Sequence, residues 1–498
     1  YRAFREQRRQ DPGFASWVRE SRPLSQISSL RQILNLDHLP APRAEAPAPP
    51  PPEPPESPAA APAAAPPAAP AAAGAAEELL AGTRLGLTAG PVTLHPDELC
   101  MHAAFLGGTG SGKTTAAVNL IEQLLERGIP AVLVDRKGDL CRYADPAAWD
   151  EPTGDAERAE RRRRLRDRLD VAVFTPGQPQ GRPLSIPVAP PGMDQLPTLE
   201  REQLAGFAAA ALGGMMGYRP KGADQSRLAI LRKAIEVLGS VAGAAATVPA
   251  LRVLLEGPDD ALLSAVGGFD PKYYKKLDED LLTLWLNNRL LLEARGEPLD
   301  IDALLGRDGR LPPGKVRLSV ISTRFLGDGA TLEFWVAQLL AELGRWTGRN
   351  PSPHLQAVFL FDEADRYLPA QRQPATKAPM ESLLKRARSA GVGVFLATQS
   401  PGDFDYKCRD NICAWLVGRI KEQTSLNKLR PMFAASKLDV SAKLPGQETG
   451  EFHLLREGQV CALKGRPSLI RTEQVPEEKI IALAAASARG NAAAAAGS

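Results

Sequence analysis

The sequence predicts an α/β protein built on a mainly parallel sheet. From about residue 77 onward, short apolar runs alternate with longer helical patterns, which is typical of such a sheet. One apolar run leads into a glycine-rich phosphate-loop motif at 107–114, and another ends in Asp362 and Glu363. No run of about 18 apolar residues occurs, so we expect no membrane-spanning helix within this chain.

Composition limits the classes of protein to which the chain can belong. The 498 residues are enough for two or three domains, and 44% hydrophobic with 24% charged residues is typical of a globular protein. A net charge of +3 excludes a histone-like binder, so any contact with nucleic acid must come from local patches. The five cysteines are scattered and form no CxxC pair, which argues against a disulfide framework or zinc site and predicts a cytoplasmic protein.

The N-terminal part differs from the rest in composition. Residues 1–40 are rich in arginine and carry a short apolar helical pattern at 27–36, whereas 41–76 are mostly proline and alanine. Because proline fixes φ and lacks an amide donor, we predict a semi-stiff extended linker at 41–76. The first forty residues are then a solvated arm, a docking segment or the end of something longer. The chain starts at Tyr1 rather than Met, so an upstream signal peptide or domain could be missing.

The first half of the core is expected at 77–194. Strands are predicted at 103–106, 130–134 and 171–174, and a helix at 114–126. A second, highly charged helix is predicted at 151–170, and we interpret its arginines as a solvated face rather than a binding site.

Strand signals disappear between 195 and 309. Apolar residues recur there at three- and four-residue spacing, which predicts a helical bundle inserted into the sheet domain. The second half of the core is expected at 310–475, with strands at 316–321, 358–361, 392–397 and 412–417. A terminal hairpin is predicted from 452–455 and 460–463, turning at Glu457 and Gly458. An alanine-rich tail is placed at 476–498, of which 482–498 are expected to be frayed.

The phosphate-loop motif carries the most specific chemical signal. It follows an apolar strand and precedes a helix, which is the context that G-x-x-x-x-G-K-[ST] requires. Its glycines let backbone amides turn toward one anion, and the dipole of the following helix favours phosphate. Lys113 can reach the terminal phosphates, and the Thr114 hydroxyl can join a magnesium shell. The predicted nucleotide-binding residues are Gly107, Gly108, Thr109, Gly110, Ser111, Gly112, Lys113, Thr114 and Thr115.

A phosphate loop needs an acidic partner, which we expect on a neighbouring buried strand. The apolar run at 357–361 ends in two carboxylates. Asp362 is predicted to hold magnesium, and Glu363 to orient and deprotonate the attacking water. Two carboxylates at this position indicate ATP hydrolysis rather than nucleotide storage.

Further candidates for the reaction lie on and before the next strand. Gln399 lies two residues after the apolar run at 392–397 and could sense the γ-phosphate or the water. A basic helix precedes that run, and an exposed arginine such as Arg386 or Arg388 could reach the phosphates of a neighbouring subunit. A solvated basic face is the alternative for these arginines.

Four pieces in this order resemble the HerA/FtsK class of P-loop ATPases: FLGGTGSGKTT, AVLVDRKGDL, AVFLFDEAD and RSAGVGVFLATQSP. The HerA-like branch and the type IV secretion and coupling ATPases look most similar, over about residues 85–475. The resemblance implies a RecA-like core, ATP and Mg²⁺ as ligands, and a ring, often hexameric, with ATP at its subunit interfaces. By motif match it makes Arg388 the arginine that acts in trans, with Arg419 as a second candidate.

The resemblance also implies a function, namely ATP-driven translocation or unwinding of DNA in DNA processing, transfer or defence. A nuclease or another protein is a possible partner. The alternatives are a motor for a protein substrate, as in secretion, and a nucleotide-gated scaffold. The chain departs from the family in having only 85–99 where HerA-like proteins carry a small N-terminal β-barrel. Candidates for phosphate contacts with DNA are Lys272, Lys275, Lys276, Lys407, Arg409, Lys464, Arg466 and Arg471.

Overall fold

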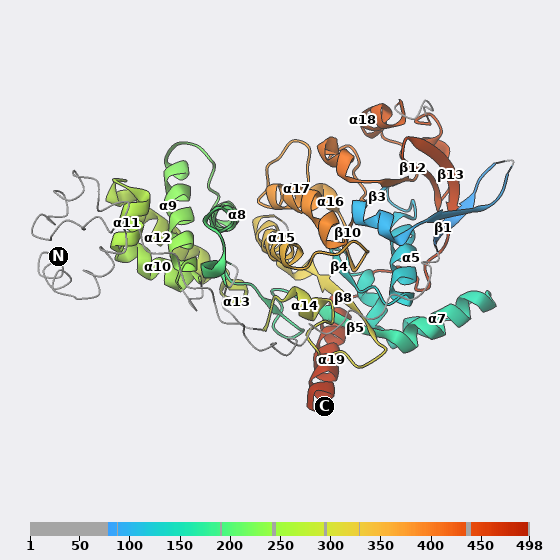
Figure 1. Cartoon of the computed structure of the whole chain (residues 1–498), viewed down its shortest axis with the longest axis horizontal. Helices are drawn as coiled ribbons and strands as arrows, with labels where there is room; N and C mark the ends of the chain where they lie inside the picture. The colour runs from blue at the N-terminus through green and yellow to red at the C-terminus, as the bar shows by residue number, and fades with distance from the viewer. Residues whose placement is uncertain are drawn as a thin grey trace, which may run out of the picture. The chain divides into compact units, whose positions relative to one another are not determined.

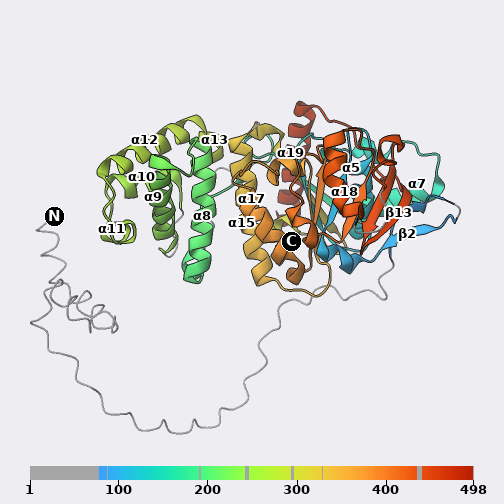
Figure 2. The same ribbon diagram turned by 90° about the horizontal axis from the view of Figure 1, so that it is seen from above.

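The computed structural model describes residues 78–86, 88–189, 192–241, 246–292, 296–327, 329–434 and 440–496, with side chains through Arg489. The arginine-rich segment at 1–40 and the linker at 41–76 lie outside these residues. Figure 1 shows the chain, and Figure 2 shows it turned by 90°. No helix in the described part of the chain is both long and apolar enough to span a membrane.

One large sheet organises the described residues. Seven strands at one end, from β11 to β5, are parallel, and the four at the other end pair antiparallel. In spatial order the strands are β2 (Pro91–Leu94), β1 (Leu79–Arg84), β13 (Gln459–Gly465), β12 (Glu451–Arg456), β11 (Ala414–Val417), β3 (Ala103–Leu106), β10 (Val392–Thr398), β9 (Ala357–Phe361), β4 (Ala131–Asp135), β8 (Val316–Ser322) and β5 (Leu169–Phe174).

The parallel strands are buried on both faces, which is why they read as continuous apolar runs in the sequence. In β3, Ala103 and Phe105 face one core, whereas Ala104 and Leu106 face the other. The first core contains the helices and turns η1 (Pro96–Met101), α5 (Lys113–Glu126), η2 (Leu140–Ala144), α6 (Pro146–Trp149), α7 (Ala156–Arg168) and α19 (Glu477–Ala496). The second contains η4 (Thr323–Leu326), α15 (Ala330–Arg349), α16 (Ala364–Tyr367), α17 (Lys377–Arg386), η5 (Ala387–Ala390), η6 (Tyr406–Asn411), α18 (Gln423–Ala434) and η7 (Leu444–Gly446).

Residues 198–292 are helical wherever the structure describes them, apart from short connections. Helix α8 packs on α15, and α9 packs against α8, α10 and α12 (Figure 1). The elements are η3 (Met193–Gln195), α8 (Thr198–Met215), α9 (Gly222–Gly239), α10 (Val248–Glu256), α11 (Asp260–Val266), α12 (Pro271–Asn287) and α13 (Arg289–Leu292). Two short strands, β6 (Leu184–Ser185) and β7 (Glu297–Pro298), pair beside them, and α14 (Ile301–Leu304) leads back to β8.

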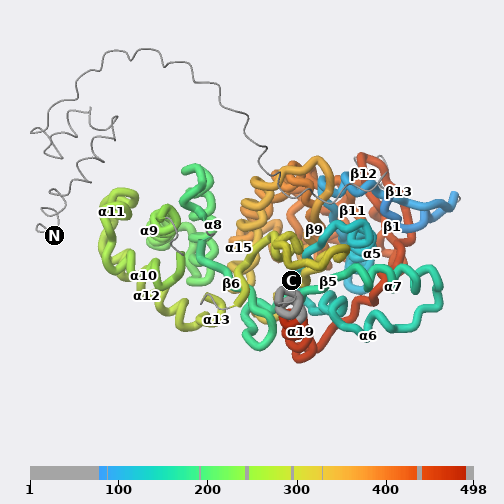
Figure 3. The backbone as a smooth tube through the Cα atoms, turned by 60° about the horizontal axis from the view of Figure 1, so that its bottom comes forward, coloured from blue at the N-terminus to red at the C-terminus, as the bar shows by residue number. Residues whose placement is uncertain are grey.

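The mainly parallel α/β fold and its strands agree with the sequence prediction, but three details differ. Strands β1 and β2 were not predicted, and they extend the terminal hairpin into an antiparallel end of the sheet. Strand β9 is not next to β3, because β10 lies between them. Residues 482–498 were expected to be frayed, yet those up to 496 belong to α19 (Glu477–Ala496), which packs beside β5 with Ala484 buried (Figure 3).

The arginines of α7 were predicted to be a solvated face. Several of them instead hold the C-terminal segment in place. Arg161 makes two hydrogen bonds to Glu126 of α5, at 3.0 and 2.9 Å. Arg162 donates to the Leu469 carbonyl at 3.1 and 2.8 Å, and Arg158 donates to the same carbonyl. Since Arg161 and Arg162 are buried, these contacts fix α7 against α5 and 468–470.

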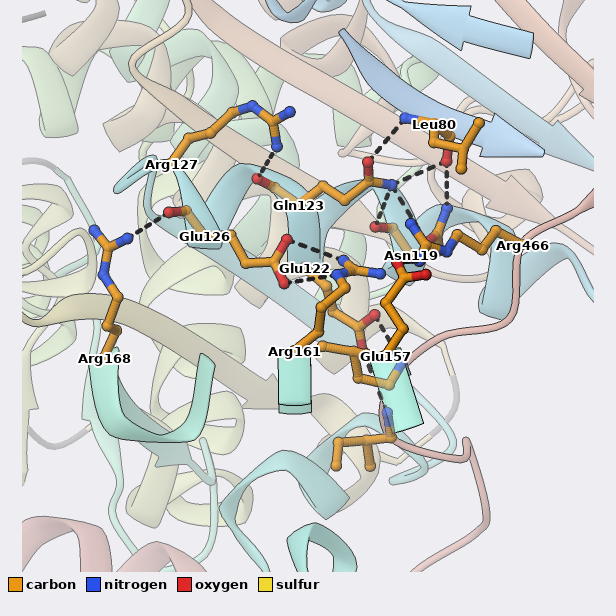
Figure 4. A network of polar contacts seen from close by, with 12 residues as sticks. Leu80, Asn119, Glu122, Gln123, Glu126, Arg127, Glu157, Arg161, Arg168 and Arg466 are labelled. Atoms are coloured by element: carbon orange, nitrogen blue, oxygen red, sulfur yellow. Dashed lines mark hydrogen bonds and ion pairs between the residues drawn. The ribbon is translucent and has the colours of Figure 1, made fainter. Parts of the chain in front are cut away.

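Helix α5 is anchored through polar side chains at its centre (Figure 4). Gln123 donates to the Leu80 carbonyl and accepts from the Leu80 amide, and Asn119 donates to the same carbonyl. Glu122 is fully buried and accepts hydrogen bonds from the Tyr143 hydroxyl and from the amide of Leu469 at 2.8 Å. The helix that follows the phosphate loop is thereby tied to β1, η2 and the C-terminal segment.

These contacts predict a pH-dependent stability. Burial raises the pKa of Glu122 to about 7, and hydrogen bonds from Tyr143 and Leu469 only partly oppose the rise. The folded protein therefore keeps a proton that the unfolded chain loses near pH 4.5, so the stabilisation is complete below that pH and is lost as the pH rises to 7. We expect Glu122→Gln to avoid this loss, which amounts to at most about 3 kcal/mol.

The measurement is the melting temperature of both proteins between pH 5 and 7.5. The melting temperature of Glu122→Gln, relative to that of the unchanged protein, should increase as the pH rises. Glu160→Gln is the control, because Glu160 lies on α7 with a half-exposed side chain. A difference that stays constant over this range would contradict the assignment.

Candidate nucleotide-binding site

Four parallel strands bring the predicted site residues to one edge of the sheet. Leu106 of β3 pairs with Thr398 of β10, and Phe361 of β9 pairs with both Leu396 and Val134. The strands therefore end side by side, and the loops that follow them meet. This edge carries the phosphate loop, Asp362, Glu363 and Gln399, and also the 135–140 loop after β4.

The phosphate loop curls at two glycines with left-handed backbone conformations. Gly110 has φ 71° and Gly112 has φ 89°, which other residues adopt only with strain. Helix α5 begins at Lys113 directly after this turn, so its first amides and its dipole lie at the loop. Thr114 and Thr115 stand in the first turn of the helix and are partly exposed. The arrangement is that of an anion-binding nest at a helix N-terminus.

Two further loops hold the phosphate loop from outside. The Gly108 amide donates to the Arg419 carbonyl at 2.9 Å, in the loop after β11. The Gly450 amide donates to the Ser111 carbonyl at 2.9 Å, and the Thr449 hydroxyl donates to the Gly110 carbonyl at 3.0 Å. Sequence reasoning missed the contribution of 448–450, since only the glycine at 450 hinted at a close approach.

Asp362 is fully buried, and its two carboxylate oxygens have different surroundings. Oδ2 lies 3.2 Å from the Lys137 ammonium, which forms an ion pair with it. Oδ1 is buried and makes no hydrogen bond to any of the residues that the structure describes. A buried carboxylate oxygen without a partner is costly, and such an oxygen fits a ligand for a hard cation.

Glu363 stands in a strained position. Its backbone is left-handed, with φ 54° and ψ 46°, at the start of α16. Non-glycine residues rarely adopt this conformation, and such strain is concentrated at functional sites. Its carboxylate lies 2.9 Å from Arg366 Nε, and the side chain is 19% exposed. Glu363 is thus accessible at the same edge as the phosphate loop.

The DRKGDL segment after β4 forms a tight turn around Asp135. The carboxylate of Asp135 accepts hydrogen bonds from the amides of Lys137, Gly138 and Leu140, at 3.0, 2.8 and 3.0 Å. Oxygens of Asp135, Asp139 and Asp362 all lie within 4.8 Å of one another. Burial raises the pKa of Asp135 and of Asp139, and the charge of neighbouring aspartates adds to the rise. Sequence reasoning noted this segment but gave none of these residues a role.

Lys113 is almost completely buried between the loop and the acidic groups, with 4% of its surface exposed. The pKa of Lys113 is lowered to about 8. Burial is the main cause and the charge of Lys137 the second, and the charge of Asp362 partly opposes both. A buried ammonium beside a phosphate loop is suited to bind a negatively charged ligand.

Gln399 is in contact with the phosphate loop. Its Oε1 accepts a hydrogen bond from the Thr109 hydroxyl at 2.9 Å. The preceding residue, Thr398, donates through its hydroxyl to Asp365 of α16, close to Glu363. The end of β10 therefore links the phosphate loop to the segment with the two carboxylates.

The three candidate arginines lie at two different edges of the sheet. Arg386 and Arg388 are exposed and precede β10, at the edge where its strands begin. Strand β10 has seven residues and spans roughly 20 Å, so Arg388 is far from the phosphate loop of its own chain. Arg419 is instead beside that loop, since its carbonyl binds Gly108.

The basic residues considered for DNA contacts are spread over the molecule, and several are ion-paired. Lys272 and Lys276 pair with acidic residues of the same helical region, and Arg466 pairs with Glu157. Lys464 donates to the Thr449 carbonyl, so it supports the phosphate-loop region. All members of the set are exposed except Arg466, which is half-buried.

The site fits a nucleoside triphosphate with a divalent cation. The nest of amides and Lys113 suit phosphates, while the orphaned Asp362 Oδ1 and the nearby Thr114 hydroxyl are oxygen donors of the kind that Mg²⁺ prefers. Glu363 and Gln399 provide a carboxylate and an amide at the same edge. This combination of groups is the one that hydrolysis of a phosphoanhydride requires.

Comparison with known proteins agrees with this assignment. Residues 81–192 match the family model described as "Helicase HerA, central domain", a segment that contains both the phosphate loop and the DRKGDL turn. A sequence search of the curated proteins finds no match.

Solved structures share the fold. The plasmid coupling protein TrwB in complex with the ATP analogue ADPNP is 13% identical with a TM-score of 0.50, covering 81% of this chain and 98% of that chain. VirB4 of Thermoanaerobacter pseudethanolicus is 15% identical with a TM-score of 0.50, covering 78% and 96%. Residues 81–192 are therefore similar to the central domain of helicase HerA, and the chain shares its fold with TrwB and VirB4.

Proposed function

We propose that this protein uses Mg²⁺-dependent ATP hydrolysis to translocate or unwind DNA, as a ring-shaped, hexameric assembly in the cytoplasm. The observation that carries the proposal is the convergence of the phosphate loop, Asp362, Glu363 and Gln399 at one sheet edge. The helicase description of the matched family model and the coupling protein TrwB support DNA as the substrate. Five free cysteines support a reducing compartment.

In the proposed reaction, Lys113 and the amides of 107–115 bind and orient the phosphates of ATP. Thr114 and Asp362 would hold Mg²⁺, which neutralises phosphate charge when bound. Glu363 orients a water molecule and accepts its proton as the water attacks the γ-phosphorus. Gln399, which is hydrogen-bonded to Thr109, positions the water or senses the γ-phosphate.

The ring assembly is supported by the location of Arg388. This residue is exposed at the sheet edge opposite to the phosphate loop of its own chain. An arginine that stabilises the transition state must contact the phosphates, so Arg388 can act only on the site of a neighbouring subunit. Arg386 is a second candidate at the same edge.

The first prediction concerns the substrate. We expect linear double-stranded DNA to stimulate steady-state ATP hydrolysis several-fold, and the stimulation to weaken between low and moderate salt because phosphate contacts release counterions. Stimulation by a protein alone would instead favour a secretion-type motor. Slow, unstimulated turnover with ATP-dependent assembly would favour a nucleotide-gated scaffold.

The second prediction concerns Glu363. Replacing it by Gln should lower the rate of ATP hydrolysis by at least about a hundredfold, because general-base catalysis contributes roughly 10² to 10⁴. Binding of a fluorescent ADP should change little, since Glu363 is not among the proposed phosphate ligands. Glu381→Gln on α17 is the matched control, and turnover that survives Glu363→Gln would show that another group is the base.

The third prediction tests the ring. Arg388→Ala and Glu363→Gln should each lose ATPase activity, but mixed assemblies contain interfaces where an intact Glu363 meets an intact Arg388 of the neighbour. Mixing the two variants should therefore give more activity than the sum of the separate proteins. Activity equal to that sum, in mixtures shown to exchange subunits, would exclude Arg388 as the arginine in trans. The corresponding mixture with Arg386→Ala distinguishes the two candidates.

A further inference from the structure

The Lys137 side chain lies where the acidic residues of the site are closest together. Its ammonium is 3.2 Å from Asp362 Oδ2, and one oxygen each of Asp135, Asp139 and Asp362 lie within 4.8 Å of one another. Three carboxylates at this spacing form a set of oxygen ligands for a divalent cation. The contact with Lys137 places a positive charge within this set.

The ion pair is asymmetric in its burial. Asp362 is completely buried, whereas the Lys137 side chain is 30% exposed and reaches the carboxylate from the solvent side. Lys113, which is buried beside the phosphate loop, forms no ion pair with Asp362 in the part of the chain that the structure describes. Lys137 is therefore the direct counter-ion of Asp362, and Asp362 Oδ1 has no hydrogen-bond partner among the described residues.

The backbone of Lys137 is held from several sides, so the position of its side chain is built into the fold. Its amide donates to Asp135 at 3.0 Å, and its carbonyl accepts from Arg324 at 3.0 Å. The next residue, Gly138, has φ 84°, which favours glycine, and a Cβ there would lie 2.6 Å from Ile480 Cδ1, so the Ile480 side chain would have to move. A loop fixed in this way presents the ammonium to Asp362 rather than leaving it mobile in solvent.

We propose that Lys137 is an internal counter-ion that prevents the Asp135, Asp139 and Asp362 cluster from binding a divalent cation unless the nucleotide is also present. This inference rests on the proposed role of Asp362 as a magnesium ligand. Lys137 lowers the affinity of the cluster for a cation, and the phosphates of the nucleotide supply the missing negative charge. Lys137 is thus a positioning residue that makes cation and nucleotide bind together.

Mn²⁺ alone tests this inference, because its free concentration can be followed by electron paramagnetic resonance without any nucleotide. Removing a charged hydrogen bond to Asp362 should free the carboxylate, so we expect Lys137→Met to bind one Mn²⁺ at least about tenfold more tightly than the unchanged full-length chain. The added Mn²⁺ should also raise the melting temperature of Lys137→Met more than that of the unchanged protein. Adding Asp139→Asn to Lys137→Met should remove the gain.

Two controls separate charge from structure. Lys137→Arg keeps the positive charge and should bind Mn²⁺ as weakly as the unchanged protein, while Lys479→Met removes a lysine whose ion-pair partner, Asp145, is not one of the three cluster carboxylates. Equal Mn²⁺ affinity in Lys137→Met and the unchanged protein, with both folded by circular dichroism, would overturn the inference, as would tight binding by Lys137→Arg. Mn²⁺ binding is measured without turnover, so failure of the proposed DNA motor would not change this result.

Discussion

Strands β3, β10, β9 and β4 run parallel and end at the same edge of the sheet, and the geometry of the whole candidate site depends on this alignment. Each strand delivers one functional loop: the phosphate loop, Gln399, the Asp362–Glu363 pair and the Asp135 turn. Since neighbouring strands lie about 4.8 Å apart, the residues after them are brought within hydrogen-bonding reach without any long loop. A shift of β9 by two residues would separate Asp362 from Lys137, and the same shift of β10 would separate Gln399 from Thr109.

The same alignment concentrates charge in a buried place, and the structure balances it locally. Asp135 is satisfied by three backbone amides, Glu363 by Arg366, and Asp362 by Lys137 on one oxygen only. Lys113 is held nearby, with its pKa lowered to about 8 by burial first and by Lys137 second. Because an unpaired buried charge is strongly destabilising, such an edge is stable only when each group has a fixed partner or a bound ligand.

The sequence predicted the parts of the site that are contiguous in the chain. The glycine pattern at 107–114 and the apolar run before Asp362 are local signals, and so are the strands that carry them. It did not predict that β10 lies between β3 and β9, because the order of parallel strands depends on long crossovers rather than on local pattern. The Lys137 contact with Asp362 joins residues 225 positions apart, and no local pattern marks it. For the same reason, the α7 arginines were predicted to be a solvated face, although Arg158 and Arg162 bind 468–470 and Arg161 binds Glu126 of α5.

The C-terminal segment shows how distant contacts stabilise this edge. Arg158 and Arg162 of α7 donate hydrogen bonds to the carbonyl of Leu469, and Glu122 of α5 accepts a hydrogen bond from the Leu469 amide. Both backbone groups of this residue are therefore held. The chain then continues into α19, whose Ile480 packs against Gly138 in the turn that carries Lys137. Helix α5 begins at the phosphate loop, and the 135–140 turn supplies the counter-ion of Asp362. Residues 468–470 therefore support the helix that follows the phosphate loop, whereas α19 packs against the turn that carries Lys137 and helps to determine where the Lys137 ammonium lies.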